Sequence, residues 1–322
     1  MRAAIYRSRG PAREVLEITE LPDPEPGRGE VRVALDFAAV NPTDWKMRSA
    51  GPPLAGPWQI PGQDGAGHID MVGPGVDPLR RGQRVWVYHA ATGSSGSAAE
   101  LVCVRDEQAV ALPKGVSEEL GAALGIPYIT AHRCLFADGP VKGATVLVTG
   151  GGGRVGHAAI RLGGWGGAWI IATAGSEETR ALARAAGAKS VLDYHSPTYS
   201  TDLAFATPGR VDRVVEVALG ANLDAQLGAL SPHAVISAYA SEANDPTIPE
   251  RRLMTANVTI HFVLVYNLTP AMLVQATSGI TGALQAGAIS AMPTQTFPLD
   301  EIAAAHDAVQ AGAVGSVLIA VR

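Results

Sequence analysis

A run of glycines at residues 150–153 is the feature of this sequence whose residue types and spacing most clearly could do chemistry. An apolar, strand-like segment precedes it and an Ala- and Ile-rich helical pattern follows it. Gly151, Gly153 and Gly156 match the spacing G-x-G-x-x-G, which allows a tight turn, close approach of the backbone to a pyrophosphate and close helix–strand packing. The unpaired N–H groups at the start of the helix then stabilise the phosphates. In this setting the spacing predicts a dinucleotide-binding site.

The end of the next predicted strand indicates which dinucleotide this is. A carboxylate about 20 residues after the glycines would accept hydrogen bonds from a ribose 2′-hydroxyl and repel a 2′-phosphate. The strand instead ends at residues 173–176 without an acid, and Ser176, Arg180 and Tyr194 could contact a phosphate there. The two glutamates that follow Ser176 are interpreted as first-turn residues of a helix that it caps. We therefore expect NADPH rather than NADH.

The composition limits the classes of partner. The chain has 322 residues, 47% hydrophobic and 17% charged, which is enough for two folded domains. The net charge is −5 and no run of five like charges occurs, which disfavours nucleic acid or a membrane surface as the main partner. The N-terminus resembles a first strand rather than a signal peptide, and no apolar stretch approaches the ~20 residues of a membrane span. We expect a cytoplasmic protein.

The pattern of the sequence changes near residue 120. Before it, short alternating segments between Pro and Gly clusters predict a small barrel or sandwich. These segments are 30–37, 68–72, 84–88 and 100–104. After it, strands and helices alternate, as expected for right-handed βαβ units of a parallel sheet.

The later strands are placed at 145–149, 169–173, 190–192, 211–217, 234–238 and 258–265. Helices are expected at 177–186 and 222–230. The helix after the glycine run should end near Leu162, because four glycines follow at 163, 164, 166 and 167. A helix at 300–311 and a strand at 316–321 should return to the first domain.

Several ordered blocks resemble the medium-chain dehydrogenase/reductase superfamily, specifically its zinc-independent quinone oxidoreductase branch, which is zeta-crystallin-like. The blocks are Val40-Asn41-Pro42, Arg48-Ser49, 61–67, 82–85, 125–131, the glycine loop, 173–178 and 304–306. The resemblance spans nearly the whole chain. It implies an α/β protein with a GroES-like β-barrel substrate domain from residues 1–122 and 267–322. Residues 123–266 would form a doubly wound, parallel-sheet Rossmann domain, with NADPH in the cleft.

The resemblance also implies which residues contact the cofactor, with Thr130 packed against the nicotinamide. The expected set is Thr130, Gly151, Gly152, Gly153, Arg154, Val155, Thr173, Gly175, Ser176, Arg180, Tyr194, Ser237, Ala238, Tyr239, Phe262, Val263 and Leu264. The strand at 258–265 would form the edge of the Rossmann sheet and pair with its twin in a homodimer.

Two positions depart from the family pattern. Arg154 stands where the family usually carries a glycine, and it could either contact a phosphate or point outward. Lys46 stands where the family often has a tyrosine in the substrate cleft, so the identity of the substrate is open.

The residues that would hold zinc in metal-dependent relatives are absent. Those relatives have a cysteine shortly before a Thr-Asp pair and then a Gly-His-Glu, whereas segments 38–44 and 61–64 here have neither. The two cysteines, Cys103 and Cys134, form no C-x-x-C pair, which also excludes a cysteine-rich lobe or a disulfide framework. We expect no metal, because no tetrahedral site can form without thiolate or imidazole at these points.

Without a Lewis acid to bind and acidify an alcohol, the favoured chemistry is hydride delivery to an electrophilic acceptor, a quinone or an α,β-unsaturated carbonyl. By resemblance, Asn41 is the first choice to donate a hydrogen bond to the carbonyl oxygen. Its alternative role is that of a turn residue before proline. Lys46 could stabilise the same oxygen or lie on the surface, and Tyr128 could be an acid but is more often a pocket wall.

Two other functions stay open. One is a pathway-specific enone or enoyl-thioester reductase, for which Arg48, Arg80, Arg81 and Arg84 could form a basic approach to the cleft. The other is a non-catalytic NADPH-binding protein.

Overall fold

The alternating strands and helices of the second half of the chain form a single parallel sheet. The computed structural model describes residues 1–207, 210–241 and 244–322. The chain forms two units, one of Met1–Ile126 with Pro293–Arg322 and the other of Pro127–Met292. The unit boundary lies at 292 rather than at 267, because helix α10 (Pro270–Gln285) packs on α5 (Arg154–Trp165).

The second unit has a six-stranded sheet in the order β10-β9-β8-β11-β12-β13, with all neighbours parallel. This is the doubly wound order of a dinucleotide-binding domain. The strands are β8 (Thr145–Val148), β9 (Trp169–Thr173), β10 (Ser190–Leu192), β11 (Val211–Glu216), β12 (Leu230–Ala238) and β13 (Thr259–Phe262). The remaining helices are α4 (Gly125–Phe136), α6 (Glu177–Ala186), α7 (Tyr199–Ala206), α8 (Leu219–Gln226) and α9 (Glu250–Thr255).

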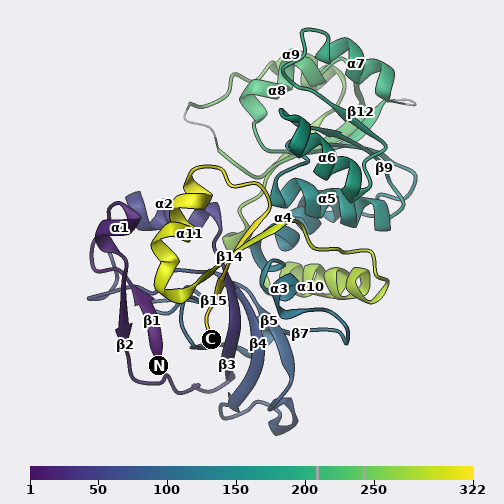
Figure 1. Ribbon diagram of the computed structural model, residues 1–322. Coiled ribbons are helices and arrows are strands. Elements are labelled where there is room, and N and C mark those ends of the chain that lie inside the picture. Colours follow the sequence, from purple (N-terminus) through teal and green to yellow (C-terminus); the bar gives the residue numbers. More distant parts are fainter. Residues whose placement is uncertain (208–209, 242–243) are drawn as a thin grey trace. The chain divides into compact units, whose positions relative to one another are not determined.

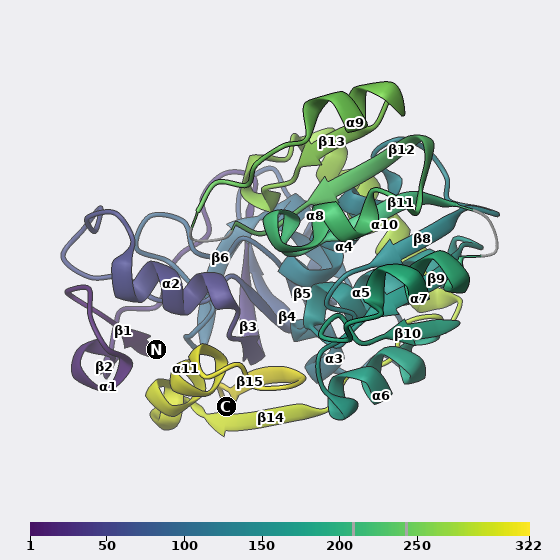
Figure 2. The ribbon, with the colours of Figure 1, turned by 90° about the horizontal axis from the view of Figure 1, so that it is seen from above.

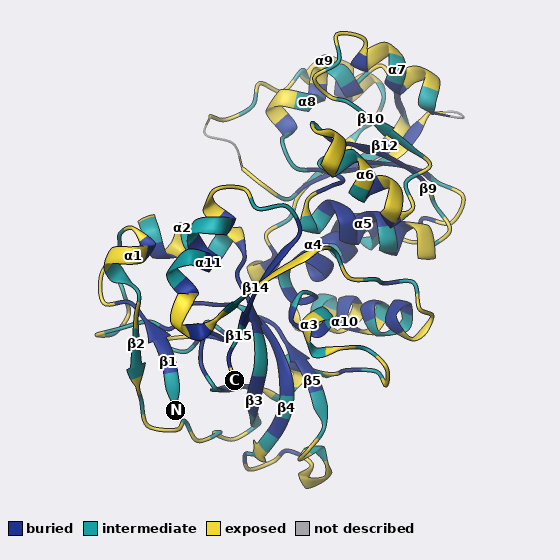
Figure 3. Ribbon diagram, viewed as in Figure 1, coloured by how far each residue is buried: buried dark blue, intermediate teal, exposed yellow. Residues whose placement is uncertain are grey.

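The central strands are apolar because helices cover the sheet. Every residue of β8 is buried, and α5 and α6 pack against β8, β9 and β10. A strand buried on both faces has a continuous apolar sequence rather than an alternating one. Figure 3 shows the contrast between these buried strands and the exposed residues of α6.

Most predicted elements of this unit appear within a few residues of their expected bounds, and α6 has the bounds predicted. The predicted end of the helix near Leu162 is wrong, because α5 continues to Trp165. Tertiary packing explains the difference. A Cβ atom on Gly163 would lie 2.7 Å from Cδ1 of Ile170, so glycine lets α5 lie close to β9. Propensity alone does not end a helix that packs this well.

The first unit contains a seven-stranded sheet, and its strand β15 comes from the end of the chain. The order is β14-β15-β3-β4-β5-β7, with β6 paired to β3. The strands are β3 (Glu30–Ala39), β4 (Asp64–Val72), β5 (Arg84–Val87), β6 (Leu101–Arg105), β7 (Ala109–Ala111), β14 (Thr294–Pro298) and β15 (Ser316–Ala320). β1 (Arg2–Ile5) and β2 (Glu17–Glu20) form a separate antiparallel pair. The helices are α1 (Ala12–Val15), α2 (Pro42–Ala50), α3 (Glu118–Ala122) and α11 (Ile302–Gln310).

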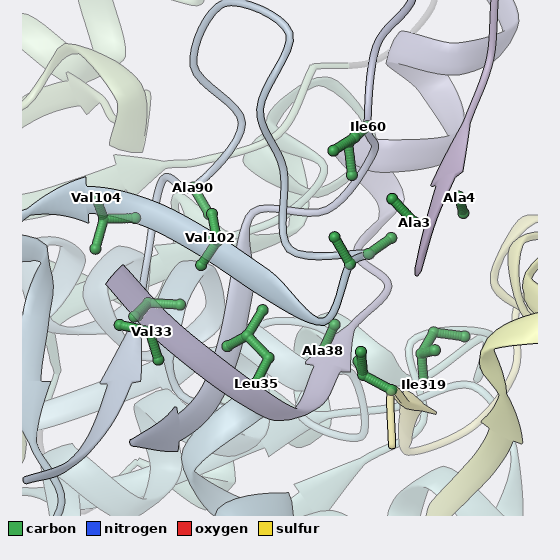
Figure 4. Close-up of a cluster of buried hydrophobic side chains, with 14 of the residues drawn as sticks. Ala3, Ala4, Val33, Leu35, Ala38, Ile60, Ala90, Val102, Val104 and Ile319 are labelled. Atoms are coloured by element: carbon green, nitrogen blue, oxygen red, sulfur yellow. The ribbon is translucent and has the colours of Figure 1, made fainter. Parts of the chain in front are cut away.

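Both chain ends therefore build the first unit. β15 pairs antiparallel with β3, and α11 packs against α1 and α2 (Figures 1 and 2). Figure 4 shows side chains from β3, β6 and β15 in one buried cluster, including Val33, Leu35, Val102 and Ile319. Within the described ranges, no helix is long and apolar enough to cross a membrane.

The substitution Gly164→Ala tests the extended helix. Gly164 lies inside α5, and apart from its chain neighbours and the nearby helix backbone no atom is within 4 Å of the position its Cβ would take. Alanine there should raise the free energy of unfolding by about 0.5–1 kcal/mol, measured by urea denaturation. Gly163→Ala is the matched control and should destabilise the protein, because its new methyl meets Ile170. A Gly164→Ala variant without any gain would contradict a helix at this position.

Buried histidines should make stability depend on pH. Burial lowers the pKa of His157 to about 4 and that of His306 to about 3, below the usual 6.5. Below pH 6.5 the unfolded chain binds protons that the folded chain does not, so stability falls as pH drops toward 4. Each histidine contributes at most about 1.4 kcal/mol per pH unit in that range.

Denaturation in urea at pH 7.5, 6 and 5 measures this slope, and His157→Leu should make it shallower by one histidine's contribution. An unchanged slope in that variant would mean that His157 titrates normally in the folded protein.

Candidate functional site

The glycine loop that links β8 to α5 forms the centre of the candidate site. Gly150 has φ +64°, a left-handed conformation that favours glycine. The N–H of Gly151 donates to the carbonyl oxygen of Thr173 at 2.8 Å, and the N–H of Gly153 donates to that of Gly150 at 2.9 Å. Because α5 begins at Arg154, the loop turns directly into the helix.

Three glycines in this loop and the start of α5 have no room for a side chain, and a Cβ atom on Gly151 would lie 2.8 Å from Cβ of Ala172. A Cβ atom on Gly156 would lie 2.2 Å from the carbonyl oxygen of Gly150. One on Gly152 would lie 2.4 Å from Cβ of Thr179, the third residue of α6. The glycines therefore hold α5 close to the loop and the loop close to α6.

The open side of the loop fits a pyrophosphate. Gly153 is exposed, whereas Gly151 and Gly152 are buried. The first N–H groups of an α-helix have no acceptor within the helix, and the N–H of Val155 at the start of α5 is one of them. Together with the positive end of the helix they form an anion site. The Arg154 side chain is half-buried, and its predicted contact with a phosphate stays a prediction.

The residues predicted to contact a 2′-phosphate gather at the ends of β9 and β10. Ser176 caps α6, and its Oγ accepts a hydrogen bond from the N–H of Thr179 at 3.2 Å. The hydroxyl of Tyr194 lies over Gly175, 2.5 Å from where a Cβ atom would be. Thr173 supports the glycine loop from the same place, because its Oγ1 accepts from the N–H of Gly150 at 3.3 Å.

Arg180 carries an ion-pair network that the sequence analysis missed. Its Nη1 lies 2.7 Å from Oδ2 of Asp193, and its Nε lies 3.1 Å from Oε2 of Glu177. A hydrogen bond from the N–H of His195 and the guanidinium of Arg180 lower the pKa of Asp193. Asp193 directly follows β10 and precedes Tyr194. Its position at the end of a predicted strand could have identified it from the sequence as a residue of the candidate site.

The residues expected near the nicotinamide lie where later strands end. Ser237 and Ala238 are the last residues of β12, and Tyr239 follows them. Phe262 is the last residue of β13, and Val263 and Leu264 follow it. The carbonyl oxygen of Ala238 accepts from the N–H of Val263 at 2.8 Å, which joins these two segments. Parallel strands place all these ends at the carboxyl edge of the sheet, where the glycine loop also lies. Thr130 is buried on α4.

A buried carboxylate joins the end of β11 to the residue that follows β8 and to α8. Glu216 ends β11, is 0% exposed, and accepts hydrogen bonds from Thr149 Oγ1 at 3.0 Å and from the N–H of Ala218 at 2.6 Å. The amides of Asn222 and Gln226 donate to it at 2.8 and 2.6 Å. Four donors compensate for the loss of water around the charge. Glu216 was not predicted from the sequence, although an acidic residue at the end of a predicted strand could have indicated a buried, hydrogen-bonded carboxylate there.

In the first unit, Asn41 belongs to a network of buried polar groups. Its Nδ2 donates to Oδ2 of Asp64 at 2.8 Å, and its N–H donates to Oδ2 of Asp44 at 2.6 Å. The N–H of Ile126 donates to the same Asp64 oxygen at 2.8 Å. Asn41 is 1% exposed and precedes Pro42, so the geometry supports its role at the start of α2. Its role as a donor to substrate stays a prediction.

The structure does not bring Lys46 into this network. Lys46 is exposed, and its Nζ lies 5.9 Å from the ring centroid of the neighbouring Trp45. Near Asp44, a small hollow of about 90 Å³ is lined by Tyr6, Arg9, Gln59 and Gln63 among others.

Tyr128 and Thr130 stand two residues apart on α4, so their side chains leave the helix in nearly opposite directions. Tyr128 is buried, and burial raises the pKa of its hydroxyl, which stays protonated. The positions of these two residues favour Tyr128 as a wall residue rather than as a partner of Thr130.

Three of the four arginines that could form a basic approach to the cleft are buried or paired with acids. Arg48 is fully buried and donates to the carbonyl oxygen of Gly10. Arg80 pairs with Asp106, and Arg84 pairs with Glu118 at 2.6 Å. Packing and acidic partners therefore remove these three from a basic approach, and of the four candidates only Arg81 is exposed.

Within the ranges that the structure describes, no group of three or more His, Cys, Asp and Glu side chains is placed to hold a metal ion. Burial raises the pKa of Cys103 and of Cys134 to about 12. A thiol that keeps its proton at neutral pH is a poor nucleophile and a poor metal ligand.

Two family models match the two parts of the chain. "Alcohol dehydrogenase GroES-like domain" matches residues 27–114, and "Zinc-binding dehydrogenase" matches residues 155–279. The quinone oxidoreductase of Mus musculus is 30% identical over 312 residues, which cover 94% of this chain and 92% of that one.

Solved structures of related proteins are similar to this chain over nearly its full length. A structure described as an NAD-dependent alcohol dehydrogenase has a TM-score of 0.88 at 29% identity and covers 100% of both chains. A mycobacterial protein complexed with NADPH has a TM-score of 0.85 at 26% identity, covering 99% of this chain and 100% of that one. The fold, the glycine loop and these matches lead to one conclusion: the chain belongs to the quinone oxidoreductase family of the medium-chain dehydrogenase/reductase superfamily.

Proposed function

We propose that this protein is an NADPH-dependent reductase of quinones or α,β-unsaturated carbonyls that works without a metal. The observation that carries the proposal is the strand–glycine loop–helix of residues 145–165, whose crowded glycines leave only the Gly153 end open to an anion. The family supports the proposed type of reaction, because relatives of this chain are named quinone oxidoreductases.

NADPH fits the residues at the end of β9 better than NADH does. Residues 173–176 provide hydroxyls and a glycine where an NAD-specific site would place a carboxylate. Ser176, Arg180 and Tyr194 would hold the 2′-phosphate, and the start of α5 would hold the pyrophosphate. When bound, NADPH supplies a hydride to the acceptor.

On the side of the acceptor, the first unit supplies hydrogen-bond donors. Asp64 accepts from the Asn41 amide and fixes its orientation, and that NH₂ group carries a second N–H for an acceptor's carbonyl oxygen. A donor that is held in place before reaction stabilises the negative charge that develops on that oxygen. Lys46 would add a positive charge on the exposed side of α2.

The proposal needs no metal because segments 38–44 and 61–64 offer no thiolate or imidazole ligand. A quinone or a conjugated carbonyl is electrophilic without a Lewis acid. The enoyl-thioester alternative has less support, because Arg48, Arg80 and Arg84 are buried or paired with acids and only Arg81 is exposed.

We further propose a homodimer through β13. This strand is one edge of the sheet, and Phe262 at its end and Leu264 after it expose 75% and 55% of their surfaces. Pairing with a second copy would cover the edge and these side chains.

Oxidation of NADPH at 340 nm in the presence of 1,2-naphthoquinone, 9,10-phenanthrenequinone and a set of enones tests the activity. We expect turnover of at least one acceptor class with NADPH, unaffected by a metal chelator. Tight NADPH binding without turnover of any acceptor would instead support a non-catalytic nucleotide-binding protein. Loss of activity with the chelator, restored by zinc, would refute the metal-free mechanism.

The substitution Lys46→Met tests the charge on α2. Removing an exposed cation that stabilises the acceptor oxygen should lower kcat/KM for the quinone by about fivefold, the size of one surface charge interaction. NADPH affinity and the melting temperature should stay as in the parent protein. Lys114→Met is the matched control, since it removes the same charge from an exposed site of the same unit after β7. Equal kinetics in both variants would remove Lys46 from the mechanism.

A further inference from the structure

The carboxylate of Glu177 lies between two arginines of α6. Its Oε2 is 3.1 Å from Nε of Arg180, and its Oε1 is 2.8 Å from Nη1 of Arg184. Residues three and seven positions after Glu177 share its side of the helix, so this convergence follows from helical geometry. Both guanidiniums lower the pKa of Glu177, which is therefore charged at neutral pH.

Arg180 has two acidic partners that differ in exposure. Asp193 lies 2.7 Å from Nη1, and its side chain is 37% exposed. The Glu177 side chain is 70% exposed, whereas that of Arg180 is 20% exposed. Asp193 is fixed in place at the end of β10, where its Oδ1 also accepts from the N–H of His195 at 2.9 Å. Glu177 is the partner that can move into solvent at little cost.

A 2′-phosphate and the Glu177 carboxylate would bind the same groups. Each is an anion with oxygens that accept from guanidinium N–H groups, and the phosphate carries more charge and one more oxygen. Ser176, which caps α6 directly before Glu177, is one of the residues proposed to contact the 2′-phosphate. Two like anions at one pair of arginines repel each other, so only one of them can stay.

We propose that Glu177 occupies the place of the 2′-phosphate between Arg180 and Arg184 and must leave it when NADPH binds. The inference rests on the proposed function and assigns two residues beyond it. Glu177 is a specificity-determining residue that weakens NADPH binding relative to NADH. Arg184 is a second cation for the phosphate. NADH has no 2′-phosphate and leaves the Glu177 ion pairs intact.

The substitution Glu177→Gln, compared with Glu178→Gln, tests the proposal on the full chain. Glu178 is the next residue of the same first turn and is exposed, and in the described part of the chain it forms no ion pair. Both substitutions remove one negative charge from the start of α6, so their effects on the helix dipole are alike. Dissociation constants for NADPH and for NADH, measured by nucleotide fluorescence, give the readout.

We expect Glu177→Gln to tighten NADPH binding by about fivefold and to change NADH binding less than about twofold. Glu178→Gln should change both dissociation constants by similar small factors. Arg184→Met should weaken NADPH binding by a few-fold and leave NADH binding unchanged.

Equal NADPH affinities in Glu177→Gln and Glu178→Gln would overturn the role of Glu177, and an Arg184→Met variant with parental NADPH affinity would overturn the role of Arg184. In both cases the parent protein still binds NADPH, so the proposed function stands. A parent protein that binds neither nucleotide would overturn the proposed function and this inference together.

Discussion

The nucleotide-binding half of this protein depends on how closely backbone segments approach each other at the glycine loop. The position of a Cβ on Gly156 is 2.2 Å from the carbonyl oxygen of Gly150, and Gly152 is as tightly placed against Thr179. Any side chain there would push α5 or α6 away from the strand ends. The same crowding leaves the loop one open end, and this end determines where a pyrophosphate can bind.

Each of the two units has a buried carboxylate that fixes the groups around it. Glu216 accepts four hydrogen bonds where β11 ends, and Asp64 accepts from Asn41 and Ile126 in the first unit. A buried charge is tolerated only with such donors, so each acid holds several segments in one arrangement. Rigid surroundings of this kind are what a site needs to orient a donor before reaction.

Much of the fold could be predicted from the sequence, and the site only in part. The apolar runs of β8 and β9 and the capped helix α6 have local signals of length, periodicity and capping. The extension of α5 to Trp165 has no local signal, because it depends on tertiary packing: the missing side chain of Gly163 lets α5 lie close to Ile170 of β9. Arg48 is similarly a surface cation by type, yet the structure buries it completely.

The sequence by itself determined the order of strands and helices, the glycine spacing, the absence of an acid at the end of β9 and the membership of a family. These properties depend only on residue types and on their spacing along the chain, and both can be read directly from the sequence. The tertiary structure decided which charges meet, as in the pairing of Arg180 with Asp193 and Glu177 and the burial of Glu216 among four donors. Such contacts form between side chains of separate strands and helices that meet at one edge of the sheet. How far apart two residues are in the sequence does not tell how close their side chains lie in the folded protein.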